Sequence, residues 1–214
     1  MKRLIFAFMV AAMPLCMSAQ NAGLFGGVQT SKAAAQDYSA YMQGAVPEQD
    51  GKVVFTKTIA APGKSKAEIY QALASWASTR YMPNVENGKW NDKDYFRNLA
   101  YSTVKSGSAA DGHIICQGSE EQVFSNKILE KDFTEVEYVL DLRITDGQVV
   151  ATMTDIAYRY TFTSVRERKP AEEVITDASV FTKKGKWIKA YRKFRIKTVD
   201  LAAELFREIE VSIK

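Results

Sequence analysis

The stretch EVEYVLDLRITDGQVVATMTDIAYRY (Glu135–Tyr160) decides the fold. Apolar residues occupy every even position of Val136–Ile144, and most residues between them are polar. Such alternation is typical of a strand with one buried face and one solvated face. The Asp146-Gly147 pair that follows is a strong short hairpin signal, so Gln148–Tyr160 is predicted as the return strand. The stretch therefore predicts an antiparallel sheet that buries one face.

Two helices are predicted to cover that buried face. Ser65-Lys66-Ala67-Glu68 is a capping box, and the helix behind it is expected over residues 66–80. One face of this helix carries Ile69, Leu73, Trp76 and Ala77. A long closing helix is indicated by apolar residues at steps of three and four, which are Val199, Ala202, Phe206, Ile209 and Ile213.

The remaining strands are expected on both sides of the first helix. Val53–Ile59 has even apolar spacing and many β-branched residues. Tyr95–Lys105, Gly112–Gly118 and a weaker Val123–Leu129 follow the helix, whereas residues 161–186 lose the pattern and are expected to be an irregular insertion. The order predicts an α+β domain over residues 52–214: strand, helix, four or five antiparallel strands and a long C-terminal helix, with the helices on one face of a curved sheet. A helix-grip fold with a large internal cavity is the alternative.

The N-terminus has the pattern of a secretory signal peptide over residues 1–19. A basic head is followed by the apolar run Leu4–Met13 and by the small residues Ser18-Ala19. The run is about half of the ~20 residues that a membrane span needs. Cys16 lacks small residues before it, so lipid anchoring is not expected. We therefore expect cleavage near Ala19, a periplasmic or secreted protein, and a flexible tether over residues 20–51.

Composition bounds the class of protein and localises its charge. The 214 residues are 46% hydrophobic and 25% charged, which excludes collagen-like, low-complexity, disulfide-framework and wholly disordered chains. The formal charge is +4, but loss of residues 1–19 leaves 27 basic residues against 25 acidic ones. Eight of those basic residues fall within residues 183–197. The mature chain is thus an acidic body with one basic segment.

The residues that common catalytic sites require are scarce. His113 is the single histidine, so a His-pair metal site cannot form, and no G-x-S-x-G, G-x-G-x-x-G or P-loop motif occurs. Loss of residues 1–19 leaves Cys116 as a single thiol, expected inside a strand. These absences favour a non-catalytic binding module without cofactor or metal. The alternative is a hydrolase of unrecognised geometry that uses His113 or a pair of carboxylates.

The basic segment Lys183–Lys197 (KKGKWIKAYRKFRIK) is the most unusual local feature. As a helix it would carry one lysine stripe, which indicates either a solvated flank or a face that binds an anionic surface. The candidate binding residues are lysines of this stripe and four aromatic residues, namely Trp90, Tyr95, Tyr101, Trp187, Lys186, Lys189 and Lys193. The expected partner is a small ligand, a glycan, a lipid headgroup or an envelope protein, and not a nucleic acid.

Three segments resemble a known family of secreted, Bacteroides-type proteins. They are Tyr41 to Phe55 with its Gly-Ala-Val-Pro, Ser65–Tyr70 with Trp76, and the Tyr138–Tyr160 hairpin. The family is described as a domain of unknown function with a TATA-binding-protein-like fold. The resemblance implies this fold, and covers residues 52–160 well and the C-terminal helix loosely.

The residues that carry the resemblance are core and turn residues. They imply a fold and transfer no active site, and the name of the fold implies no DNA binding. Val123–Leu129 and residues 161–186 go beyond the strand–helix–four strands–helix pattern that the resemblance implies, so the edge of the sheet stays open at this point.

Overall fold

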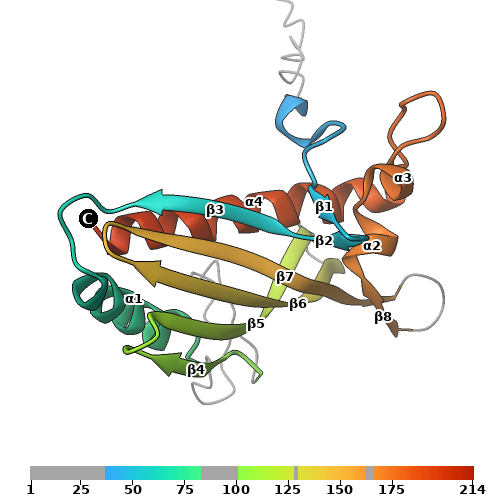
Figure 1. Ribbon diagram of the computed structural model, residues 1–214. Helices are drawn as coiled ribbons and strands as arrows, with labels where there is room; N and C mark the ends of the chain where they lie inside the picture. Colours follow the sequence, from blue (N-terminus) through green and yellow to red (C-terminus); the bar gives the residue numbers. More distant parts are fainter. Residues whose placement is uncertain (1–36, 83–100, 128–129, 162–165) are drawn as a thin grey trace, which may run out of the picture. The chain divides into compact units, whose positions relative to one another are not determined.

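A hairpin of two long strands, β6 (Glu130–Thr145) and β7 (Gln148–Thr161), forms the centre of the sheet (Figure 1). Its turn is Asp146-Gly147, as predicted, and Gly147 adopts a left-handed φ of 75° that suits glycine. The apolar residues at even positions of Val136–Ile144 are at most 2% exposed. The alternation in the sequence therefore identified the buried face.

The computed structural model describes residues 37–82, 101–127, 130–161 and 166–214, all within one compact unit, Asp37–Lys214. Its main sheet is antiparallel in the order β3-β7-β6-β5-β4, and β8 also pairs with β7. The other strands are β3 (Phe55–Ala60), β4 (Thr103–Ser108), β5 (His113–Lys127) and β8 (Arg166–Pro170), while β1 (Glu48–Gln49) and β2 (Lys52–Val53) form a small separate ribbon.

Helix α1 (Lys66–Arg80) has the predicted bounds and the predicted cap. The Glu68 amide donates to Ser65 Oγ at 3.3 Å, and the Ser65 amide donates to Glu68 Oε2 at 2.8 Å. The start of the helix is also tied to the central hairpin, because the Lys66 amide donates to Asp146 Oδ1 at 2.7 Å. Ile69 and its helical neighbours Leu73 and Ala77 are fully buried against the sheet.

Helix α4 (Lys189–Ser212) packs beside α1 and over the same apolar face. Its buried residues include Leu205, Phe206 and Ile209, and the Tyr158 and Thr198 hydroxyls are hydrogen-bonded at 2.6 Å. Within the described ranges, no helix combines the length and the apolar composition that a membrane crossing needs. The expected α+β architecture, with a curved sheet and a long C-terminal helix, is confirmed.

Strand β5 differs from the prediction because one strand replaces two. Gly112–Gly118 and Val123–Leu129 were expected separately, but β5 continues from His113 to Lys127 beside β6. A register shift between Val123 and Ser125 absorbs one extra residue, so the strand bends without ending. Of the predicted strand Tyr95–Lys105, residues 95–100 lie outside the described residues.

Residues 166–186, in the segment expected to be irregular, are more regular than expected. Strand β8 pairs with the end of β7 and runs into two short helices, α2 (Ala171–Val174) and α3 (Asp177–Val180). An isolated bridge then joins Phe181 to Trp187. These elements are too short for the sequence pattern to define them, and their order comes from buried residues such as Ile175 and Val180.

The predicted tether also ends earlier than residue 51. Residues 37–53 lie against the helices, and the buried Arg195 anchors them by donating to the Tyr41 carbonyl at 2.7 Å and to the Met42 carbonyl at 2.6 Å. Arg195 also lies 2.7 Å from Asp177 Oδ1, and Asp177 Oδ2 accepts from the Gly44 amide at 2.9 Å. Sequence periodicity did not predict this order because it depends on contacts made across the chain. The signal peptide and residues 20–36 lie outside the described residues.

A buried ionic network joins the two helices to the sheet. Arg80 of α1 lies 2.8 Å from Glu120 of β5 and 3.2 Å from Glu208 of α4, and the Tyr138 hydroxyl also donates to Glu120. Trp76 donates its indole N–H to Glu208 at 3.1 Å. Burial raises the pKa of Glu208, although the Arg80 guanidinium opposes this shift. One guanidinium thus connects three elements that are distant in sequence.

Gly118 of β5 leaves the space that the Tyr138 ring occupies. A Cβ at position 118 would lie only 2.1 Å from the ring, and both residues are buried. We expect Gly118→Ala to lower the free energy of unfolding by about 2 kcal/mol or more, since overpacking forces buried side chains from their rotamers. Urea denaturation measures the loss. The double variant Gly118→Ala/Tyr138→Leu should lose less than the sum of the two single variants, and strict additivity would contradict the steric explanation.

Arg195→Met should lower the free energy of unfolding by about 3 kcal/mol, because it removes the ion pair of Asp177 and the donor to three backbone carbonyls. It should also speed proteolytic cleavage within residues 37–53. The matched control is Arg192→Met, which removes a cation–π contact with Tyr38 and should cost about 1 kcal/mol or less. Equal effects of the two variants, or unchanged cleavage, would show that Arg195 does not hold the segment.

Candidate functional site

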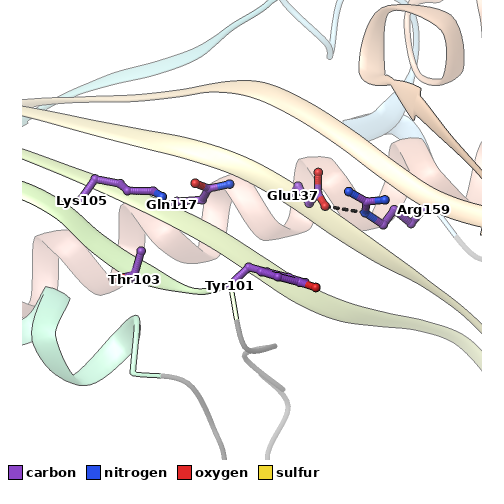
Figure 2. A pocket seen from close by; sticks show the side chains of 6 residues that line it. All are labelled: Tyr101, Thr103, Lys105, Gln117, Glu137 and Arg159. Carbon is purple, nitrogen blue, oxygen red and sulfur yellow. Dashed lines mark hydrogen bonds and ion pairs between the residues drawn. The ribbon is translucent and has the colours of Figure 1, made fainter.

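The face of the sheet opposite α1 and α4 carries polar side chains and a hollow of about 530 Å³ (Figure 2). The residues that line the hollow come from the start of β4 and from three neighbouring strands; they are Tyr101, Thr103, Lys105, Gln117, Glu137 and Arg159. They converge because side chains on one face of adjacent strands lie side by side. The hollow is the candidate functional site.

The pairing of the strands places the lining residues. Thr103 of β4 lies directly opposite Gln117 of β5, and the next strand contributes Glu137. Tyr101 lies just before β4 and is 66% exposed, which is unusual for a large ring. In Figure 2 the Lys105 side chain extends toward Gln117, and the Tyr101 ring points toward the side where Glu137 and Arg159 lie together. The site therefore combines an aromatic ring with hydrogen-bonding groups.

Charges of both signs line the hollow. Glu137 lies 2.6 Å from Arg159 and 2.8 Å from Arg168. Burial raises the pKa of Glu137, but the hydrogen bonds from Arg168 and Arg159 outweigh it, so the pKa lies below its ordinary value. Among the described residues no carboxylate pairs with Lys105. The hollow therefore contains the Lys105 ammonium, which can pair with a ligand, and the Arg159 guanidinium, whose side chain is 45% exposed.

The arrangement suits binding of a polar ligand that carries negative charge. A carboxylate or sulfate can pair with Lys105 and with the outer nitrogens of Arg159, while Gln117 and Thr103 both donate and accept hydrogen bonds. The exposed Tyr101 ring offers a flat apolar surface with a negative face, which attracts the C–H groups of a ring-shaped ligand. In the part of the chain that the structure describes, no three His, Cys, Asp or Glu side chains meet as metal ligands.

His113 and Cys116 occupy different environments. His113 is the first residue of β5, and its Nε2 lies 3.0 Å from Asp141 Oδ1 of β6. Ser108, the cross-strand neighbour of His113, donates its hydroxyl to Asp111 and not to the imidazole. Cys116 is buried among apolar residues, and burial raises the pKa of its thiol to about 12. At neutral pH that thiol is protonated and is therefore a poor nucleophile.

The predicted binding residues lie in separate places. Trp90 and Tyr95 lie outside the described residues, whereas Tyr101 lines the hollow. Lys186 and Trp187 belong to a short hairpin before α4, and Lys189 is the first residue of the helix. The structure therefore brings Lys186, Trp187 and Lys189 together, on elements that do not line the hollow of Tyr101.

Lys193 does not belong to a free basic stripe, which was one of the two interpretations of this segment. Its ammonium lies 2.6 Å from Asp132 and 2.7 Å from the Tyr160 hydroxyl, and it covers the Phe124 ring at 4.5 Å. The expected helical stripe also fails at Lys186, because α4 begins three residues later. Segment 183–197 is thus a hairpin followed by a partly buried helix. Spacing alone could not show which basic residues have partners across the fold.

Five of the six lining residues were missed as site residues. The alternation placed Glu137 on the solvated face of the sheet, but it gave no reason to assign this residue to a site. The signal that could have found the others is the same alternation carried across neighbouring strands, which puts Thr103, Gln117 and Arg159 on that face. The missing information was the register between strands, because register decides which polar residues meet.

Glu137→Gln should lower stability by about 1 kcal/mol at neutral pH, because it removes an ion pair with two partly exposed arginines. The native pKa of Glu137 is lowered, so the stabilisation is complete above the pKa of the unfolded carboxyl and is lost as the pH falls through the native pKa. Urea denaturation should show that the difference shrinks toward zero in strong acid. Glu167→Gln, on an exposed pair, is the control, and a difference independent of pH would contradict the assignment.

Comparison with known proteins places the chain in a family. Residues 55–159 match the family described as "Domain of unknown function (DUF4468) with TBP-like fold". No curated protein sequence matches the chain. A crystal structure of a DUF4468 family protein from Bacteroides ovatus is 33% identical, with a TM-score of 0.71, and the match covers 84% of this chain and 96% of that one. A TBP-like protein from Parabacteroides distasonis shares the fold at 22% identity, with a TM-score of 0.61, over 78% of this chain and 96% of that one. The chain therefore belongs to the DUF4468 family and has its TBP-like fold.

Proposed function

We propose that this protein is a non-catalytic binding module of the periplasm or cell exterior, and that the hollow on the open face of its sheet binds an acidic carbohydrate. The single observation that carries the proposal is the exposed Tyr101 ring beside the half-exposed Arg159 and beside Lys105, which has no carboxylate partner among the described residues. The extracytoplasmic location rests on the signal-peptide pattern of residues 1–19.

The chemistry of the hollow supports a sugar acid over other small ligands. A sugar ring can stack on Tyr101, its carboxylate can pair with Lys105 or Arg159, and its hydroxyls can bond to Gln117 and Glu137. A purely apolar ligand would gain little, because polar and charged side chains line most of the hollow. A nucleic acid is disfavoured by the carboxylate of Glu137 and by the expected location outside the cytoplasm.

The ligand has the size of a short oligosaccharide. A volume of about 530 Å³ falls within the range of ~300–1,000 Å³ that is common for ligand sites. The hollow is open to solvent along the sheet, so a longer chain can continue past it. Polysaccharides that contain uronic acids are therefore a suitable first class of ligand.

Calorimetric titration of the full chain with oligogalacturonate tests the proposal. We expect saturable binding that weakens with salt, and much weaker binding of a neutral glucose oligosaccharide of equal length. Tyr101→Ala and Lys105→Gln should each weaken binding about tenfold, because each removes a contact that a buried sugar acid would make. Lys57→Gln, which removes an exposed lysine from β3, is the matched control and should bind as the unaltered protein does.

Two results would refute the proposal. One is the absence of binding to any acidic oligosaccharide. The other is binding that persists unchanged in both the Tyr101→Ala and the Lys105→Gln variants, since the hollow would then not be the site.

A further inference from the structure

A short basic hairpin, residues 181–187, projects beyond α3 just before α4 begins (Figure 1). Its tip is Lys183-Lys184-Gly185-Lys186, and Gly185 adopts a φ of 70° that the turn requires. All four tip residues are exposed, and Lys189 lies just beyond on the first turn of α4. The hairpin lies outside the sheet and shares no residue with the hollow.

The positive charge of the hairpin is not neutralised within the described residues. The three lysines of the tip and Lys189 form no ion pair with another described residue. Lys193, in contrast, lies against Asp132. The nearest short helix contributes Asp177, but that carboxylate is held by Arg195. The first turn of α4 contains no acidic residue. The lysines are thus free to attract an external anion.

The hairpin is held in place at its base. The Phe181 and Trp187 ring centroids lie 4.6 Å apart, and the Thr182 amide donates to the Lys186 carbonyl at 2.9 Å. Arg195 lies over the Phe181 ring at 5.2 Å, so the same arginine that anchors residues 37–53 also supports the hairpin. Little backbone freedom is therefore left to lose when the tip binds a partner.

The expected location of the protein favours a membrane as that partner. The signal-peptide pattern of residues 1–19 predicts export, so the mature chain is expected in the periplasm or at the cell exterior, where it meets membrane surfaces. On the described domain, Tyr38 packs against Trp187 at the base of the hairpin, with ring centroids 6.2 Å apart, and leaves the lysine tip exposed.

The shape of the hairpin also distinguishes a membrane from a glycan. A projecting lysine tip can touch several phosphates of a flat surface at once, whereas none of its residues carries a ring on which a sugar can stack. Clustered exposed lysines are a recurrent means of binding anionic lipids. We propose that the basic hairpin, with Lys189, docks the protein on an anionic membrane surface through contacts between lysine ammonium groups and lipid phosphates.

Cosedimentation of the full chain with vesicles tests this surface. Binding should be stronger to phosphatidylcholine vesicles with about 30% phosphatidylglycerol than to phosphatidylcholine alone, and should fall about tenfold or more between about 50 mM and about 300 mM salt. The variant Lys183→Glu/Lys184→Glu/Lys186→Glu should lose at least about tenfold in affinity for anionic vesicles. The difference between vesicle types separates the hairpin from any contribution of the apolar N-terminal stretch.

The matched control makes the same change of charge elsewhere. Lys57→Glu/Arg143→Glu/Lys214→Glu alters three partly or largely exposed basic residues on other elements and should retain binding within about threefold. Equal loss in both triple variants, equal binding to neutral vesicles, or hairpin-dependent binding to oligogalacturonate without binding to vesicles would each overturn the proposal. Thermal unfolding of both variants verifies that they fold. Because Tyr101 and Lys105 are unchanged in both, failure here leaves the carbohydrate proposal untouched.

Discussion

The buried guanidinium of Arg80 is the interaction on which the packing of this domain depends. It meets Glu120 of β5 and Glu208 of α4, while its own helix, α1, is tied by its first residue to the hairpin turn at Asp146. A charge buried this deeply is costly without partners, so both carboxylates must be in place when the helices settle on the sheet. The network therefore specifies how α1 and α4 lie on the apolar face, and Gly118 admits the Tyr138 ring that completes it.

Helices α1 and α4 both cover the apolar face of the sheet, so the opposite face carries polar side chains. The register of β4 to β7 then collects a ring, an ammonium, a guanidinium and an amide around one hollow. A second charged surface, the basic hairpin, is built on different elements and is supported by Arg195. The two arginines thus have parallel roles. Arg80 joins both helices to the apolar face of the sheet, so the face with the hollow stays uncovered, and Arg195 holds the N-terminal segment and the hairpin in place. The proposed sugar site and the proposed membrane contact can therefore act independently.

The parts of this fold that were predictable from sequence are those encoded by local patterns. The Ser65–Glu68 capping box, the alternation of Val136–Ile144 and the Asp146-Gly147 turn each reflect neighbours within a few residues. The order of residues 37–53 depends on Arg195, which lies some 150 residues away, and no periodicity encodes such a contact. The candidate site could be predicted only in part for the same reason. Tyr101 was identified as an aromatic candidate, but Gln117 and Arg159 lie near it only because of the register between strands, which local patterns do not encode.

Mapping of backbone amide chemical shifts during titration of the isotopically labelled protein with oligogalacturonate tests the central claim most directly, namely that the helix-free face of the sheet is the binding surface. The shifts should change in β4 and β5 around Thr103 and Gln117 and extend to Glu137 and Arg159. They should leave the buried faces of α1 and α4 unchanged. Changes confined to the helices, or to residues 181–187 alone, would contradict the assignment of this face as the site.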